Sequence, residues 1–571
     1  MESASNDQTQ TKLKRSLKLR DLYLAAISAI FATAWILSPY FSAAIAGPAS
    51  IISWVIGGVF ITIIAITWAE IGSMLPLSGG VARYLTYTHG KVAGAMMGWA
   101  NLLTTIVYPA LETVALTSFI QALISIYDPR STIKLISSIG TPTYTGVVVA
   151  LLVVSLLFVI NYTGVRNVKI MNIVANIIKL IAMPAAIIFI LAFGLYHGFG
   201  SNFVVAGFAP YGYAPVFTII PATGIVFAYL GFRQPIDMAA EAVNARKDVG
   251  RAILLAMATA FAIYTLMEVA FIGGLKWDSA SFGTSGVTAG NWIGLTSSLR
   301  MATMPILYET VGLGIFVITV LVAAAGLVGP PADAGQYMAS TARILYGISR
   351  DGFLGKSFSR VHAKYRIPYL GVLITFIVTT VLLLLGVAGY LVTSIGGAWL
   401  ALVSIVSTTS VFAYMVGPLA LIILRKTNPN AERPFKVKYA SVVAPLAFII
   451  SGLMFYWGAG VLFSSGDPYG GYILIILLLA GVLLFYTRDK ASEKTQADLK
   501  NSMWIIIFLI LNIILLALGS YQLNIIKMPY DWILDIIINI FVYIYAIRSS
   551  LSYGTITNTV ENLLKIQEGE A

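Results

Sequence analysis

The chain of 571 residues contains no cysteine, only three histidines and few charged residues. Without cysteine it cannot form disulfides, zinc–thiolate sites or iron–sulfur clusters. The histidines, His89, His197 and His362, are far apart in sequence and suggest no imidazole metal site, so we expect neither a metal nor a cofactor. Charged residues make up 11%, against about 25% in soluble proteins, which excludes a soluble enzyme, a nucleic-acid-binding protein and a disordered scaffold.

The chain is rich in apolar residues, which form long hydrophobic runs. Apolar residues make up 58%, and the mean hydropathy is +0.87. A spanning helix needs about 20 mainly apolar residues to cross roughly 30 Å of hydrocarbon. Fourteen stretches meet this requirement: 22–46, 49–74, 93–124, 144–161, 171–196, 213–241, 250–275, 308–341, 367–388, 391–424, 441–464, 469–487, 502–520 and 529–548. The sequence therefore predicts an all-α integral membrane protein of about 14 transmembrane helices, surrounded by a lipid bilayer.

The basic residues predict how these spans are oriented. With a cytoplasmic N-terminus and alternating spans, 29 of the 36 Lys and Arg residues lie in cytoplasmic segments, five lie outside, and Lys179 and Arg233 lie within spans. This asymmetry is what the positive-inside rule describes. The net charge of +12 is thus a topology signal and indicates no nucleic-acid partner. We predict a multi-pass protein of the plasma membrane with both termini in the cytoplasm.

The chain divides into three parts. Residues 1–21 form a cytoplasmic N-terminal tail, and residues 22–487 hold twelve spans that make the natural unit. Residues 488–571 add a charged linker, two further spans and a short C-terminal tail. The sequence carries no signal for an oligomeric state or for the role of the two added spans.

Two spans contain helix-breaking residues near their middle. In the first, "AISAIFATAWILSPYFSAAIAGPASIISW", Pro39 lacks a backbone N–H and is expected to open the helix near Ala32–Ser38. In the sixth, "TGIVFAYLGFRQPIDMAAEAV", Gly231 and Pro235 flank Arg233. Interrupted helices at matching positions of two halves point to a substrate site at the middle of the membrane. The breaks are five spans apart, which predicts two inverted five-helix halves; simple kinks in packed helices are the alternative.

Three segments carry a family resemblance. They are "GPASIISWVIGGVFITIIAITWAEIGSMLPLSGGVARYLTYTHG", "GFRQPIDMAAEAVNARKDVGRAI" and "ASTARILYGISRDGFLGKSFSRVHAKYRIPYLG". In this order they resemble the amino acid–polyamine–organocation (APC) transporters, over residues 16 to about 487. "SGGVARYLTYTHG", "GWAN" and "GFRQPIDMAAE" are most similar to the aspartate–proton symporter-like branch. The resemblance implies a LeuT-like fold, a 5+5 inverted repeat with discontinuous helices 1 and 6 and two further helices.

The resemblance also implies a substrate site at the two breaks. A half-helix N-terminus offers N–H donors and partial positive charge to a substrate carboxylate, while free carbonyls of the other break would receive the ammonium. The residues implied are Ala32, Thr33, Ala34, Trp35, Phe227, Ala228, Tyr229 and Leu230. The side chain of Phe227 or Tyr229 would close over the ligand, although ordinary helix packing would also account for these rings. Where the family usually has Gly-Ser/Thr-Gly at the first break, this chain has Ala32-Thr33-Ala34, which leaves the identity of the substrate open.

Arg233 is a cation deep in the sixth span. Its guanidinium stays protonated at any accessible pH, and a charge near the bilayer centre costs about 2.5–3.5 kcal/mol on the insertion scale. It therefore needs an anionic neighbour. Asp237, four residues on, could pair with it along one helix face, although such a pair contributes only about 0.2–0.5 kcal/mol. Alternatively, Arg233 binds the side-chain carboxylate of an acidic substrate through a bidentate contact.

Four further ionisable residues are candidates for coupling and gating. A lysine at the position of Lys179 occupies, in the APC family, the place where sodium-coupled relatives hold an ion. This implies that Lys179 loads and releases a coupled proton, with a static amine bound to carbonyls of the first helix as the alternative. Glu112 is either a second proton site or a partner of Arg233. Glu70 is expected to latch the inner gate with the basic loop after the eighth span, which includes Arg343.

The chain has no Walker loop, nucleotide fingerprint or large soluble domain, so the energy for transport must come from an ion gradient or from exchange. Nor does it group His, Asp and Glu as a membrane-embedded enzyme would. We expect a secondary active transporter, not an enzyme, that imports an amino acid by proton symport through alternating access. Aspartate and glutamate are candidate substrates because of Arg233. An exchanger or facilitator without proton coupling and a transporter-like amino acid sensor are the alternatives.

Overall fold

The computed structural model describes residues 17–569 except 77–79, 129, 138–139, 198, 205–206, 276–315, 351–353, 391–396, 464–467 and 487–492. Within these ranges the chain is built of helices, and its β-type pairing is limited to two isolated bridges. In lipid, an α-helix satisfies all backbone hydrogen bonds within one segment, which is why apolar runs of this length become helices. The predicted all-α membrane fold is confirmed.

Each predicted span corresponds to helix in the structure. In chain order these helices are α1 (Leu19–Ile30) with α2 (Ala34–Ala46), α3 (Ser50–Met74), α5 (Lys91–Tyr127), α6 (Tyr144–Tyr162), α7 (Val165–His197), α8 (Ala214–Ala222) with α9 (Ile225–Tyr229) and α10 (Gln234–Asp237), α11 (Ala245–Gly274), α13 (Phe316–Arg350), α14 (Tyr369–Val387), α15 (Ala398–Tyr414) with α16 (Val416–Thr427), α17 (Ala440–Val461), α18 (Gly470–Tyr486), α19 (Glu493–Leu518) and α20 (Tyr530–Arg548). The ends of four predicted spans, 308–315, 391–396, 464 and 487, lie outside the described residues.

Eleven of the described helices are long and apolar enough to cross a membrane, or up to twelve if a bent pair counts as one span. One of the eleven is the stretch Ala34–Met74, in which α2 and α3 are joined by a short 3-10 turn, η1 (Gly47–Ala49). Its 41 residues would extend roughly 60 Å as one helix, twice the hydrocarbon thickness. We therefore assign α2 and α3 to two successive passes that turn at η1.

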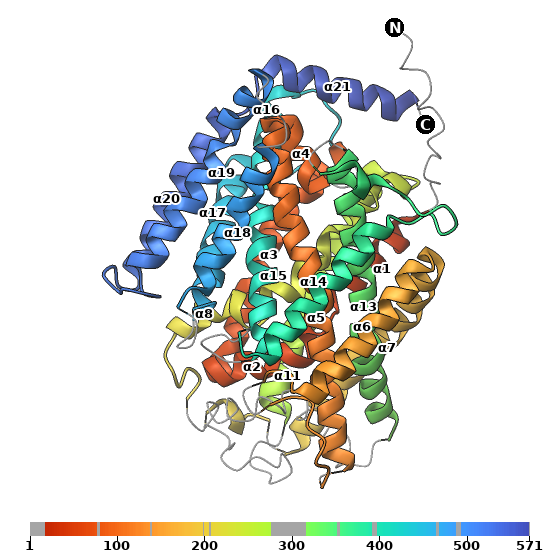
Figure 1. The fold of residues 1–571 in the computed structure, drawn as a ribbon. Coiled ribbons are helices and arrows are strands. Elements are labelled where there is room, and N and C mark those ends of the chain that lie inside the picture. Colours follow the sequence, from red (N-terminus) through yellow and green to blue (C-terminus); the bar gives the residue numbers. More distant parts are fainter. Residues whose placement is uncertain are drawn as a thin grey trace.

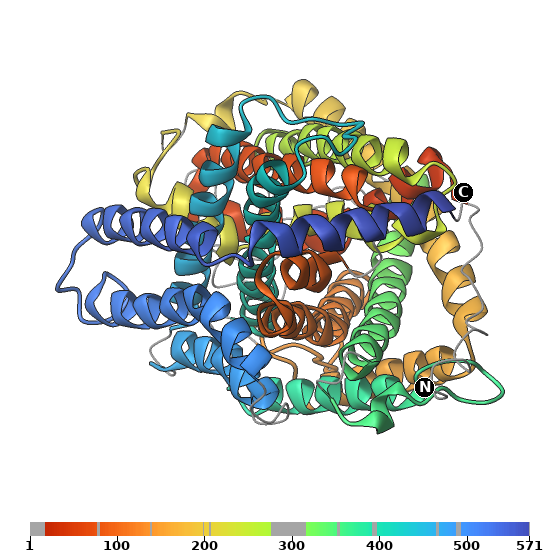
Figure 2. The same cartoon turned by 90° about the horizontal axis from the view of Figure 1, so that it is seen from above.

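The long helix α5 runs near the centre of the bundle (Figure 2) and packs against α13, α15 and α4 (Gly80–His89). The helices α17 to α20 lie together on one side of the molecule in both views (Figures 1 and 2). A final helix, α21 (Tyr553–Gly569), crosses one end of the bundle and contacts α4 and α16. There the Thr557 hydroxyl donates to the carbonyl of Thr427 at 2.9 Å.

The two added spans are joined to the core by polar contacts. On α20, Asp531 accepts a hydrogen bond from the Tyr456 hydroxyl of α17 at 3.0 Å. On α19, Asp498 accepts from the backbone N–H of Lys91, the first residue of α5, at 2.9 Å. A carboxylate at a helix N-terminus satisfies an unpaired N–H and complements the helix dipole. The two added spans, which we call the appendage together with the rest of residues 488–571, therefore both contact the first twelve spans.

The first span is interrupted at Phe31–Thr33, between α1 and α2. The expected opening at 32–38 is displaced toward the N-terminus, and Pro39 lies inside α2. The break falls where side chains of other helices reach the carbonyls that it frees. The Tyr264 hydroxyl donates to the carbonyl of Ile30 at 2.7 Å, and the Lys179 ammonium donates to the carbonyl of Ser28 at 3.2 Å.

The sixth span is interrupted twice. Between α8 and α9 the axis bends by 57° at Thr223–Gly224, where Gly224 adopts a φ of +88°. A 3-10 turn, η3 (Leu230–Arg233), then separates α9 from α10. Pro235 lies in the first turn of α10, where its missing N–H would have had no helical partner. The prediction of discontinuous first and sixth helices is confirmed.

Candidate functional site

The break in the first span is bracketed by ionisable side chains from two other helices. On the side of α2, the Thr33 hydroxyl donates to Glu112 of α5 at 3.3 Å. On the side of α1, Lys179 of α7 reaches the carbonyl of Ser28. A cation at a helix C-terminus and an anion at a helix N-terminus both complement the helix dipoles. The structure thus places Thr33, Glu112 and Lys179 around one break.

Lys179 forms a buried ion pair with Asp333 of α13. Its ammonium donates to the two carboxylate oxygens at 2.9 and 3.0 Å, and the side chains are 2% and 3% exposed. Asp333 was missed in the sequence analysis, although an acidic residue in "GPPADAGQ" within an apolar span is itself a signal of a site. Its partner could not be identified from sequence, because 154 residues separate the two.

Asn172, Asn176 and Lys179, spaced four and three residues apart on α7, share one helix face, and their side chains contact two neighbouring helices. Asn176 accepts a hydrogen bond from the Ser28 hydroxyl of α1 at 2.5 Å. One helical turn away, the Asn172 side chain donates to Gln336 of α13 at 3.2 Å. Together with the contacts of Lys179, these hydrogen bonds link α7 to α1 and α13.

Arg233 is held by its own helix and by α5. Its Nε donates to Asp237 at 3.2 Å, and its Nη1 donates to the side-chain oxygen of Asn101 at 2.6 Å. The guanidinium also lies over the ring of Tyr414, 5.9 Å from the centroid. The pairing with Asp237 along one helix face is therefore present. The anionic partner that Arg233 contacts is Asp237, whereas the described contact of Glu112 is with Thr33.

The carbonyls expected to receive a substrate ammonium have protein partners in this structure. The Leu230 carbonyl accepts from the Tyr414 hydroxyl at 2.9 Å, and the Phe227 carbonyl accepts from the backbone N–H of Leu230. The carbonyls of Phe227, Ala228 and Leu230 were expected to be free, and we correct this expectation for Phe227 and Leu230. The Phe227 carbonyl is occupied by the first residue of the 3-10 turn at Leu230–Arg233, and the Leu230 carbonyl is occupied by Tyr414 of α15.

The two candidate closing rings face different neighbours. The ring of Phe227 lies 5.3 Å from that of Tyr108, which stacks on Tyr337 at 3.5 Å between centroids. The ring of Tyr229 packs instead against Trp54 and Tyr264. Of the remaining candidates, Ala32, Ala34, Trp35 and Ala228 are buried.

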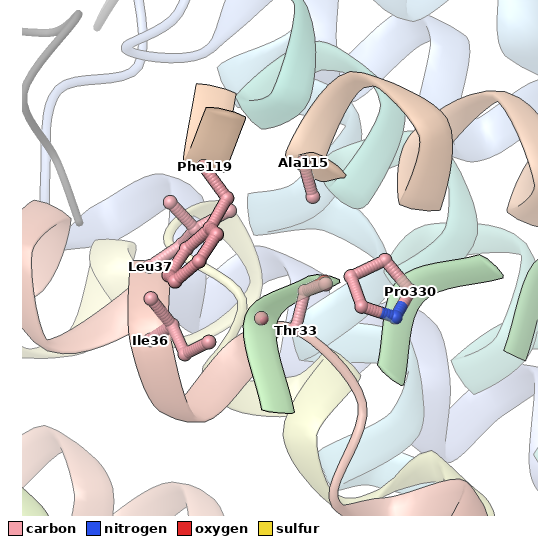
Figure 3. Close-up of a pocket in the computed structure, with 7 residues that line it drawn as sticks. Thr33, Ile36, Leu37, Ala115, Phe119 and Pro330 are labelled. Carbon is pink, nitrogen blue, oxygen red and sulfur yellow. The ribbon is translucent and has the colours of Figure 1, made fainter. Parts of the chain in front are cut away.

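A small cavity opens beside the first break (Figure 3). It has a volume of only about 10 Å³, roughly the space of one water molecule, and is lined by Thr33, Ile36, Leu37, Ala115, Phe119, Gly326 and Pro330. Its walls come from α2, α5 and α13, and Thr33 is the member that was predicted at the substrate site. A methyl group on Gly326 would lie 2.3 Å from the Phe119 ring, so only glycine leaves room for that ring. The cavity is thus a small, mainly apolar space next to Thr33.

Glu70 forms its ion pairs with α16 and the segment that follows. Arg425 binds both of its carboxylate oxygens, at 2.8 and 2.6 Å, and Arg433 lies at 3.3 Å. The backbone N–H of Val437 also donates to Glu70 at 2.6 Å. Arg343, the expected partner, is exposed on α13. In this structure Glu70 therefore joins α3 to α16, because packing brings the end of α16 to Glu70, and its expected contact with the basic loop after the eighth span is not among the described contacts.

Glu268 forms another buried polar cluster. It accepts hydrogen bonds from Ser42 of α2, at 2.9 Å, and from Ser50 of α3. The Trp54 indole in turn donates to Ser42 at 3.3 Å. These contacts tie α11 to the second half of the first span. Among the described residues, no group of three or more His, Asp or Glu is placed to hold a metal ion.

These features define a class of protein. Two apolar spans come apart inside a helical bundle, and the ends of the first meet a buried ion pair, a buried glutamate and a cavity. Discontinuous helices of this kind form the midplane sites of secondary transporters, where half-helix ends bind charged groups. The chain has the architecture of a multi-span membrane transporter.

Comparison with known proteins gives the family. The model of the amino acid permease family matches residues 17–468, so the chain belongs to this family of the APC superfamily. The glutamate/serine transporter AimA of Bacillus subtilis (strain 168) is 30% identical over 546 residues, covering 94% of each chain. The aspartate-proton symporter of the same organism is 28% identical over 549 residues, covering 96% of this chain and 99% of the relative. These relatives are named as transporters, which places this chain among transporters and not enzymes.

A crystal structure of a mutant manganese transporter from Eremococcus coleocola aligns over 88% of this chain and 99% of that one, with a TM-score of 0.47 and 14% identity. The family assignment depends on the sequence matches and on the two interrupted spans.

Proposed function

We propose that this protein is a secondary active transporter that imports an amino acid by proton symport through alternating access. The observation that carries the proposal is the buried Lys179–Asp333 pair at the open end of α1. When an ion pair lies at a helix break, protonation changes the charge of the pair and therefore how strongly the pair binds the backbone of the half-helix. Such a pair can couple the uptake of a proton to the movement of that half-helix. The names of the relatives, a glutamate/serine transporter and an aspartate-proton symporter, support both the substrate class and the coupling ion.

In this mechanism the start of α2 holds the substrate carboxylate with its N–H groups and the Thr33 hydroxyl. The ammonium then takes the place of the Tyr414 hydroxyl at the Leu230 carbonyl in the break of the sixth span, and Phe227 closes beside it. Lys179 and Glu112 belong to the proton site, and Glu70 belongs to the inner latch. We place the protein in the plasma membrane with cytoplasmic termini, because 29 of its 36 basic residues then face the cytoplasm.

The test is uptake by the purified protein in liposomes, with labelled aspartate, glutamate, serine and leucine as substrates. An inwardly directed proton gradient is expected to raise the accumulation of at least one amino acid about tenfold above the level without a gradient. Collapsing the gradient with a proton ionophore is expected to abolish the difference. Uptake that is insensitive to the gradient would contradict proton symport.

Exchange without proton coupling is the second candidate. It is favoured by the full set of contacts on the Lys179 ammonium, two from Asp333 and one from Ser28, which suits a static cation. Counterflow separates the two candidates. An exchanger would show rapid counterflow of unlabelled against labelled amino acid, with no net uptake into empty liposomes under a proton gradient.

Arg233→Ala tests whether the guanidinium selects acidic substrates. If Arg233 binds a side-chain carboxylate, removing it is expected to lower the preference for aspartate over leucine by at least tenfold, because a charge-assisted contact is lost only for aspartate. The measurement is competition between the two labelled amino acids in liposomes. Asp237→Asn is the control, since it removes the partner on the same helix and keeps the guanidinium. An unchanged preference in Arg233→Ala would assign Arg233 to helix packing alone.

A further inference from the structure

We propose that Asp333 is the group that takes up the coupled proton, and that its ion pair with Lys179 must open before the first half-helix can move. The inference rests on the proposed proton symport and names the residue that carries the proton. It differs from the expectation for Lys179 alone, because the lysine here keeps its charge while its partner changes state.

The contacts of Lys179 join three helices. Its ammonium has three protons, and the described contacts give one to each oxygen of Asp333 on α13 and one to the carbonyl of Ser28 on α1. A methyl group on Gly329 of α13 would lie 3.2 Å from the lysine side chain, so the stem also packs closely on α13. The end of α1 is thus tied to α13 through a side chain of α7.

Few other charged groups face this pair. Glu112 of α5 lies within electrostatic reach of both members, and its described hydrogen bond is to Thr33. The hydroxyls of Tyr337 on α13 and Tyr264 on α11 also lie within electrostatic reach of Asp333, and that of Tyr108 on α5 lies within reach of Glu112. The two remaining α-helices that pack on α13, α6 and α14, contain no Asp, Glu, Lys, Arg or His.

Opening an intact buried ion pair leaves two unpaired charges in the membrane, which is costly. Adding one proton to a carboxylate oxygen of Asp333 turns it into a neutral carboxylic acid and removes one of the two charges. The ammonium keeps all its protons and is then held by the Ser28 carbonyl. No covalent bond other than the new O–H forms, and release of the proton on the inner side reverses the step.

This sequence of events explains why the proton and the half-helix are linked. With Asp333 ionised, Lys179 is held on α13 and holds α1 with it. With Asp333 neutral, the contact between α7 and α13 weakens, and α1 can separate from α13. Asp333 is therefore a coupling residue that acts through Lys179, and no direct contact with the substrate is required of it.

The experiment compares wild type, Asp333→Asn, Asp333→Glu and the double variant Lys179→Met/Asp333→Asn in liposomes. Each is measured for accumulation of labelled amino acid under an inward proton gradient and for counterflow without a gradient. Asp535→Asn is the matched control, because Asp535 is another fully buried aspartate, on α20 of the appendage. The double variant removes both charges and so avoids leaving a lone buried lysine.

We expect Asp333→Asn to lose at least tenfold in gradient-driven accumulation while counterflow stays within about threefold of wild type. Asp333→Glu is expected to recover part of the coupling, because it keeps a carboxylate, and Asp535→Asn is expected to behave as wild type. If Asp333→Asn does not fold, the double variant replaces it in both measurements. We then expect the double variant to show the same loss of accumulation and the same preserved counterflow.

Gradient-driven accumulation that persists in Asp333→Asn or in the double variant would overturn the role of Asp333 and leave proton symport standing. Loss of accumulation in Asp333→Glu equal to that in Asp333→Asn would also count against a proton on this carboxylate. If wild type itself shows counterflow but no gradient-driven accumulation, the proposed symport fails, and the inference fails with it. The behaviour of wild type therefore distinguishes the two failures.

Discussion

Gly224→Ala is expected to reduce transport at least tenfold and to destabilise the protein by about 2–5 kcal/mol. Gly224 lies at the bend of the sixth span with a φ of +88°, a conformation that costs an L-residue about 1–2 kcal/mol. Its new methyl group would also lie 2.4 Å from the Ser38 hydroxyl oxygen and 2.9 Å from the Trp399 ring. Because Ser38 is on α2, the substitution would push apart the halves of the two interrupted spans. Thermal unfolding in detergent and uptake in liposomes would measure the effects.

Gly389→Ala is the matched control for this prediction. Gly389 has a φ of +80°, but a methyl group there would meet no atom within 4 Å. It therefore reports the backbone strain without the steric clash, and we expect a loss of about 1 kcal/mol with transport preserved. Equal effects of the two substitutions would contradict the close packing of Gly224 against α2.

Glu70→Ala is expected to lower stability by about 3 kcal/mol, the lower end of the range for breaking a buried ion pair. Glu70 is 1% exposed and holds Arg425 in a bidentate contact, with Arg433 beside it. Its removal leaves Arg433, whose side chain is 5% exposed, without its carboxylate. The estimate is at the lower end because Arg425 is partly exposed and can turn to water. We expect the unfolding temperature in detergent to fall, and the latch between α3 and α16 to be lost.

Glu432→Ala is the control for Glu70→Ala. Glu432 pairs with Arg246 at 3.2 Å, but its side chain is 72% exposed. An exposed ion pair contributes about 0–1 kcal/mol, so we expect a small change in unfolding temperature and normal transport. If Glu432→Ala lowered the unfolding temperature as much as Glu70→Ala, burial could not be the reason that the Glu70 ion pair stabilises the protein.

The spans could be predicted well because they depend on local composition. A run of apolar residues is helical wherever it crosses lipid, so the fourteen stretches agree with the described helices without knowledge of their neighbours. The position of a break is less local. Pro39 and Pro235 are tolerated within or at the start of helices, and the first span opens at Phe31–Thr33, where Tyr264 and Lys179 take up the freed carbonyls.

The sequence predicted which residues belong to the site, but it did not predict which of them contact one another. Lys179, Glu112 and Thr33 stood out because polar groups in apolar spans are rare, and all three lie at one break. The acidic partner of Lys179 was missed, and the partner of Glu70 was expected on the wrong loop. Asp333 and Arg425 are 154 and 355 residues away from these side chains, so no spacing in the sequence relates them.

Composition and the order of apolar runs were sufficient to establish a helical membrane protein, and Pro39, Gly231 and Pro235 marked its first and sixth spans as interrupted. The helical spans follow from the interaction of each segment with lipid, which is much the same whatever surrounds it. Which buried charges pair, and which carbonyls at the breaks are occupied, depended on how the helices pack. An ion pair inside a membrane forms only between side chains that the fold brings within about 3–4 Å, and that distance is a property of the whole bundle.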